Sequence, residues 1–122
     1  MIVFDASALL AFLQSEPGSN EVDRLLEVGG ACSAVNWSEV AQKLRAAGAD
    51  WNAARDILLS YPLTIEPVTA ADAEEAAGLW RRGSGLSLAD RLCLALGHRL
   101  AADRIVTADR AWAEMDGVQV IR

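Results

Sequence analysis

The sequence predicts an α/β fold in which a parallel β-sheet is covered by helices on both faces. Short apolar runs rich in β-branched residues alternate with longer segments of helical periodicity along the chain. Helical segments of this length can serve as the crossovers that parallel strands require. The 122 residues, 52% hydrophobic and 23% charged, suit one compact domain over residues 1–122.

The predicted strands are apolar runs that end at polar or turn-forming residues. The first is Ile2-Val3-Phe4, and the last follows the turn signal Asp116-Gly117. In chain order, we expect strands at residues 2–4, 31–35, 63–68, 104–107 and 118–121.

The predicted helices begin at capping residues and end near glycine or proline. In chain order, they cover residues 7–14, 19–28, 36–47, 51–60, 69–82, 87–101 and 109–115. Asn36, Thr69 and Ser87 are the clearest start signals. Pro17 and Gly29 mark two of the ends. The helix at 87–101 carries a leucine at every fourth position, which forms a stripe that faces the core.

The chain is acidic, with 17 Asp and Glu against 11 Lys and Arg and a formal net charge of -6. A negative net charge repels nucleic acid, so a nucleic-acid enzyme of this composition needs metal ions or a local arginine cluster. All basic residues except Lys43 are arginines, whose planar guanidinium suits phosphate. Most such charges are nevertheless simply solvated.

Several classes of protein are disfavoured. No apolar stretch is long enough to span a bilayer, and no basic segment precedes the first apolar run. We therefore expect a cytoplasmic protein without a membrane partner. Cys32 and Cys93 stand far apart and His98 is the only histidine, which excludes a zinc site. We assign both cysteines to the core and no chemistry to His98.

Four acidic residues stand where a parallel sheet would gather them. Asp5 and Asp109 follow predicted strands, and Glu39 and Asp90 each stand three residues after a capping residue at a predicted helix start. The carboxyl ends of parallel strands line one edge of the sheet, where ligands bind, so we expect the four carboxylates to converge there. Taken singly, each is better explained as a helix cap.

A cluster of carboxylates requires a counterion. Each close pair of like charges costs on the order of 1 kcal/mol in a wet site. Oxygen ligands without a nearby histidine or thiolate suit Mg²⁺, with Mn²⁺ as a substitute. Such ions activate water and stabilise the leaving oxygen of a phosphodiester, so phosphodiester hydrolysis is the leading chemistry.

The segments around these acids are IVFDASAL (2–9), SAVNWSEV (33–40), GLSLADR (85–91) and TADRAW (107–112). With these segments in order over its whole length, the chain resembles PIN-domain ribonucleases, and specifically the VapC toxins of type II toxin–antitoxin systems. The resemblance implies a three-layer α/β sandwich and a Mg²⁺-dependent endoribonuclease. It also implies the catalytic metal ligands, which are Asp5, Glu39, Asp90 and Asp109. Ser7 and Thr107 would be supporting polar groups near the metal.

The resemblance further implies partners, which are an RNA substrate such as tRNA or rRNA, a cognate VapB-like antitoxin and a second copy in a homodimer. Apart from the resemblance, Phe12, Leu13, Leu25 and Leu26 are more large apolar groups than a small domain easily hides. We expect a groove between helices 7–14 and 19–28 that accepts an amphipathic helix. The alternative is that these side chains simply cover the sheet.

Other residues are weaker candidates for contact with RNA. Arg91 and Arg110 adjoin proposed ligands, with a plain surface role equally open. Core packing is the default for the tryptophans, but Trp37 stands two positions from Glu39.

The residues disfavour two other functions and leave a third open. A receiver domain has similar length and architecture but needs a lysine in a late strand, whereas Lys43 stands in an early helix. A haloacid-dehalogenase phosphatase needs a second aspartate two residues after the first, where this chain has Ser7. A non-catalytic PIN scaffold that binds protein stays open as the alternative function.

Overall fold

The computed structural model describes residues 1–122 and contains five strands in one parallel sheet. The strands are β1 (Ile2–Phe4), β2 (Gly30–Ser33), β3 (Leu63–Glu66), β4 (Arg104–Thr107) and β5 (Val118–Val120). Their order across the sheet is β3-β2-β1-β4-β5, and every neighbouring pair is parallel. All five carboxyl ends therefore point to the same edge of the sheet.

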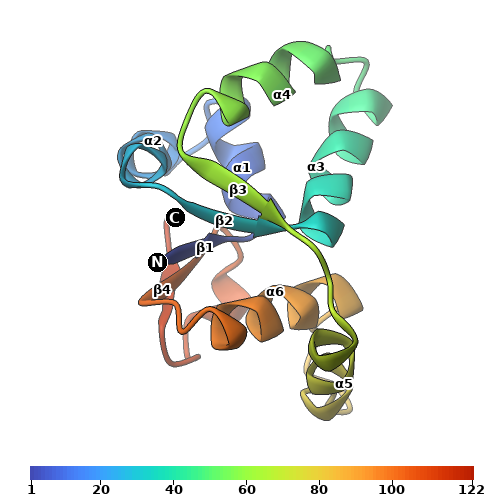
Figure 1. The fold of residues 1–122 in the computed structure, drawn as a ribbon. Coiled ribbons are helices and arrows are strands. Elements are labelled where there is room, and N and C mark those ends of the chain that lie inside the picture. The colour runs from blue at the N-terminus through green and yellow to red at the C-terminus, as the bar shows by residue number, and fades with distance from the viewer.

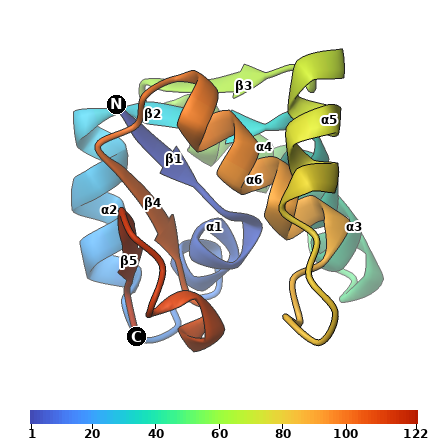
Figure 2. The ribbon, with the colours of Figure 1, turned by 90° about the horizontal axis from the view of Figure 1, so that it is seen from below.

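Helices cover both faces of this sheet. They are α1 (Ala6–Leu13), α2 (Ser19–Val28), α3 (Ala34–Ala46), α4 (Trp51–Leu59), α5 (Ala70–Gly78) and α6 (Leu88–Arg99), with the 3-10 turn η1 (Arg110–Trp112). In Figure 1, α1 to α4 lie on one side of the sheet, and α6 lies on the other with α5 beside it. Figure 2 shows α5 packed along α6 on that second face. The predicted three-layer α/β sandwich is confirmed.

The two faces of the sheet are buried in two separate cores. Side chains of β1 alternate between them: Ile2 and Phe4 belong to the larger core with α1 to α4, whereas Val3 belongs to the smaller core with α6 and Trp112. Because β1 lies in the middle of the sheet, every side chain it carries is apolar and buried. The residue that follows it is therefore held at a rigid position.

Most helix boundaries lie within two residues of those predicted, and the larger differences have local causes. Helix α3 starts at Ala34, because the Ser33 hydroxyl accepts a hydrogen bond from the backbone N–H of Asn36 and caps the helix three residues earlier than expected. Helix α5 ends at Gly78, the poorest helix former in that segment. The predicted helix at 109–115 is only η1, where the Asp109 carboxylate accepts from the N–H of Ala111.

The apolar groove expected between residues 7–14 and 19–28 is absent. Leu25 and Leu26 are buried in the larger core, and Leu13 packs against it. Phe12 contacts Tyr61 edge-to-face, with ring centroids 5.7 Å apart. These side chains cover the sheet, and the pocket at the turn between the two helices has no hydrophobic lining residue. No helix is both long and apolar enough to cross a membrane.

Candidate active site

Asp5 lies at the carboxyl end of β1 and is buried, with 4% of its surface exposed. Its Oδ2 accepts hydrogen bonds from the hydroxyls of Ser7 at 2.6 Å and Thr107 at 2.9 Å. The Ser7 oxygen in turn accepts from the N–H of Ala108 at 2.9 Å, and that of Thr107 from the N–H of Asp109 at 3.0 Å. Two backbone N–H groups thus orient two hydroxyls toward one carboxylate, which fixes its position.

The pKa of Asp5 is raised above its ordinary value of 3.8. Burial is the largest cause, because it disfavours the charged form. The hydrogen bonds from Ser7 and Thr107 act in the opposite direction, and the negative charges of Asp90 and Glu39 raise the pKa further. The charges of two other predicted carboxylates therefore act on Asp5.

Glu39 is held by a relay of side chains that starts at the end of β2. The Ser33 hydroxyl donates to Oδ1 of Asn36 at 2.9 Å, and Nδ2 of Asn36 donates to Oε1 of Glu39 at 2.8 Å. Asn36 is fully buried and lies inside α3, whose first turn holds no acidic residue. The sequence indicated Asn36 only as a helix cap, and its positioning role appears in the structure. Its spacing of three residues before Glu39 was the available signal.

Asp90 lies where the sequence predicted, in the first turn of α6. It forms a capping box with Ser87: the N–H of Ser87 donates to Asp90 Oδ2 at 2.9 Å, and the N–H of Asp90 donates to the Ser87 hydroxyl at 3.1 Å.

Asp109 is exposed just beyond β4, and its Oδ1 accepts from the N–H of Ala111. Asp109 also lines a pocket together with Ser7.

Each of these four acids has one carboxylate oxygen held by a protein donor and one without a hydrogen-bond partner. The oxygens without a partner are Asp5 Oδ1, Glu39 Oε2, Asp90 Oδ1 and Asp109 Oδ2. A set of hard oxygen donors fits Mg²⁺ or Mn²⁺. No three acidic, cysteine or histidine side chains lie close enough together to hold an ion as they stand. A cation would therefore have to draw the carboxylates together.

The pocket beside Asp109 has a volume of about 590 Å³ and opens next to the acids. It is lined by Ser7, Ala108, Asp109, Arg110 and Arg122. Arg110, one of the predicted RNA-contact candidates, makes no hydrogen bond or ion pair with the protein. The other candidate, Arg91, donates to the carbonyl of Ala76 at 2.8 Å and has its Nε buried, so it joins α6 to α5.

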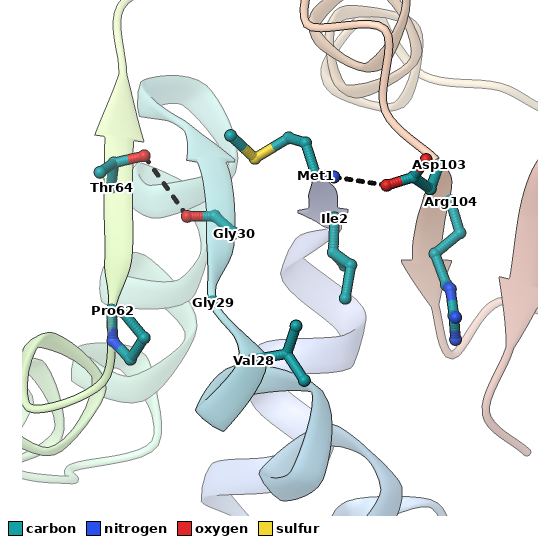
Figure 3. A pocket seen from close by; sticks show the side chains of 9 residues that line it. All are labelled: Met1, Ile2, Val28, Gly29, Gly30, Pro62, Thr64, Asp103 and Arg104. Atoms are coloured by element: carbon teal, nitrogen blue, oxygen red, sulfur yellow. Dashed lines mark hydrogen bonds and ion pairs between the residues drawn. The ribbon is translucent and has the colours of Figure 1, made fainter.

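A further pocket of about 490 Å³ lies at the opposite edge of the sheet, where the strands begin (Figure 3). Its lining includes the start of β1 at Ile2 and of β2 at Gly30. The one carboxylate among its lining residues, Asp103, forms an ion pair with the amino group of Met1. This pocket lacks the acids described above and is not part of the candidate site.

Three of the four tryptophans serve the core. Trp112 is fully buried, Trp51 is buried, and Trp37 packs edge-to-face against Trp51 with ring centroids 5.1 Å apart. Trp80 differs because 51% of its surface is exposed, and the guanidinium of Arg82 lies 5.8 Å from its ring centroid.

His98 and the cysteines take no part in the candidate site. His98 is exposed and its Nδ1 lies 2.7 Å from the carboxylate of Glu75, a partner that the sequence did not suggest. Cys32 and Cys93 are free and buried, and burial raises the pKa of both thiols. Neutral buried thiols are unreactive, as expected from the sequence.

Comparisons with known proteins agree with this architecture. The family described as PIN domain matches residues 2–118. A toxin–antitoxin complex from Klebsiella pneumoniae contains a chain with 22% identity and a TM-score of 0.76, covering 100% of this chain and 98% of that one. VapC20 of Mycobacterium tuberculosis, a toxin that cleaves the sarcin–ricin loop, has 21% identity and a TM-score of 0.78, covering 98% of each chain. No curated protein matches this sequence significantly.

Proposed function

This chain belongs to the PIN domain family, and from that premise we propose that it is a Mg²⁺-dependent endoribonuclease that acts as the toxin of a toxin–antitoxin pair. The observation that carries the proposal is the buried Asp5 carboxylate, fixed by two hydroxyls and raised in pKa mainly by burial and further by the charges of Asp90 and Glu39. A buried carboxylate that feels other negative charges costs stability and indicates a functional role.

The proposed cation ligands are Asp5, Glu39 and Asp90, with Asp109 at the side of the pocket. A bound cation would neutralise these carboxylates and supply an activated water for attack on the phosphorus. The protein's own contribution is to hold each acid by one oxygen so that the other stays available. Ser7 and Thr107 do so for Asp5, and Asn36 does so for Glu39.

The proposed substrate is RNA, and the proposed regulator is an antitoxin that covers the site. VapC20 is a toxin that cleaves the sarcin–ricin loop, and the Klebsiella structure is a toxin–antitoxin complex, which supports the proposal of both properties for this chain. A basic side chain inserted by the antitoxin among the acids would neutralise them in place of the cation. We also propose a cytoplasmic homodimer, in keeping with the family.

Cleavage of RNA by the purified protein tests the enzymatic proposal. We expect cleavage with Mg²⁺ or Mn²⁺ and none in EDTA. Asp5→Asn and Asp90→Asn should each abolish cleavage, because the amide keeps the shape but loses the charge that binds the cation. Asp116→Asn is the matched control, since Asp116 is an exposed acid outside the site, and it should cut at the parent rate. Cleavage that survives chelation would contradict the proposal, and so would cleavage by either site variant.

Co-expression tests the antitoxin. Expression of the chain alone should arrest growth, and the product of the neighbouring gene should restore growth and co-purify with the chain. Failure of the two proteins to co-purify, with cleavage undiminished in the presence of both, would leave a stand-alone nuclease.

A non-catalytic binding module is the second candidate. The observation in its favour is that Asp90 and Asp109 serve as ordinary helix-end acceptors and that no three acids are close enough to hold an ion as they stand. RNA cleavage separates the two functions. A binding module would bind the antitoxin but leave RNA intact with every metal ion tested.

A further inference from the structure

We propose that Arg110 and Arg122 together bind a backbone phosphate of the RNA strand next to the acid cluster, an inference that rests on the proposed nuclease function. Both guanidinium-bearing residues line the pocket of about 590 Å³ described above. The sequence indicated Arg91 and Arg110 as candidates for contact with RNA, and Arg122 is added by the structure.

Ser7 connects the pocket to the buried Asp5. Ser7 lines the pocket, and its hydroxyl donates to the buried Asp5 carboxylate at 2.6 Å. Arg110 stands directly after Asp109, which shares the same lining. A phosphate bound in this pocket would thus belong to the same RNA strand as the phosphodiester bond that faces the carboxylates.

The two arginines of this pocket differ in the partners of their guanidinium groups. Arg110 has no hydrogen-bond or ion-pair partner, so all its N–H groups are available. Arg122 forms an ion pair with Glu16, which holds its side chain at the pocket while 35% of that side chain stays exposed. By contrast, Arg99 is paired with the buried Asp72.

The two arginines at this pocket offset the repulsion between an acidic protein and RNA. The net charge of -6 repels a polyanion, and the acids of the site add to that repulsion. Arg110 has all its N–H groups free, and Arg122 keeps those that Glu16 does not accept, so the two guanidinium groups can bind a phosphate through several N–H groups. Phosphodiester phosphate is therefore the chemistry that this pocket fits.

Binding of a short fluorescein-labelled single-stranded RNA, followed by fluorescence anisotropy in EDTA, tests the inference. The salt concentration is varied between about 0.05 and 0.2 M for the parent, Arg110→Ala and Arg122→Ala. Arg55→Ala is the matched control, because it also removes one positive charge but lies on α4, outside the pocket, with its nearest carboxylate 3.9 Å away. Each pocket variant should weaken binding about 3- to 10-fold and reduce the salt slope by about 0.7, whereas the control should match the parent.

Pocket variants that bind like Arg55→Ala, or a parent that does not bind RNA, would overturn the inference. The same preparations are assayed for cleavage with Mg²⁺, which separates this inference from the proposed function. Cleavage by the parent without any arginine effect on binding would defeat the inference alone. Arginine-dependent binding without cleavage would support the phosphate site and defeat the nuclease proposal.

Discussion

Replacement of Asp5 by asparagine should stabilise the metal-free protein at neutral pH. The folded state holds this carboxylate in a buried position beside the charges of Asp90 and Glu39, so its pKa is raised. A raised folded-state pKa means that the folded protein binds the proton more tightly than the unfolded chain does. Ionisation of Asp5 therefore lowers stability as the pH rises through that raised value, and the neutral amide avoids this loss.

The expected gain is small but measurable. Removal of the repulsion from one neighbouring like charge is worth on the order of 1 kcal/mol. The hydroxyls of Ser7 and Thr107 bind a charged acceptor more strongly than an amide, which offsets part of the gain. We expect a net increase of about 1 kcal/mol in the free energy of unfolding, or roughly 3 to 5 °C in Tm for a domain of this size.

Thermal unfolding followed by circular dichroism in EDTA, from about pH 3 to about pH 8, measures this effect. The gain should be full near neutral pH and should vanish below the ordinary aspartate pKa of 3.8, where Asp5 is protonated in both states. The control Asp116→Asn should change stability by less than about 0.5 kcal/mol at any pH. A lower Tm for Asp5→Asn at neutral pH, or a gain that does not depend on pH, would refute the reasoning.

Three further substitutions test the packing that positions the site. Gly30→Ala should destabilise the protein by about 3 kcal/mol in denaturant unfolding, because a Cβ would lie 2.3 Å from the carbonyl oxygen of Ile2. Gly78→Ala, where a Cβ would meet nothing within 4 Å, should instead be neutral or stabilise by up to about 1 kcal/mol. Asp72→Ala should cost about 2 kcal/mol at neutral pH, since it removes a buried acceptor for Arg99 and half of a capping box. The pKa of Asp72 is lowered below its ordinary value of 3.8. The cost of the substitution should therefore shrink as the pH falls through the folded-state pKa. An equal cost at acid pH would contradict the role of the charged Asp72.

The fold class and the order of elements followed from the sequence because local signals specify them. The run Ile2-Val3-Phe4 and the capping box of Ser87 and Asp90 act over a few residues, and the structure retains both. The start of α3 did not follow, because Ser33 and Asn36 are both good caps and the end of β2 decides between them. The order of strands across the sheet depends on contacts between distant segments, which no local pattern specifies.

The sequence and its resemblance placed the acids and the supporting hydroxyls of Ser7 and Thr107, but not the roles of Asn36 and Arg122. Asp5 could be placed because it directly follows a buried strand. The role of Asn36 as a donor to Glu39 depends on its complete burial, which appears only in the packed structure. Arg122 stands far from Ser7 in sequence, and only the sheet brings both to one pocket. The apolar groove failed as a prediction because Leu25 and Leu26 were needed to fill the core.

The central claim is that the acids at the carboxyl edge of the sheet bind a divalent cation. Anomalous diffraction from crystals of the protein grown with Mn²⁺ tests it directly, because the peak locates the ion without reference to activity. We predict one strong peak within about 2.2 Å of carboxylate oxygens of Asp5 and Asp90, with Glu39 or Asp109 completing the contact. The absence of a peak there at saturating Mn²⁺, or a peak only at another place on the protein, would contradict the claim.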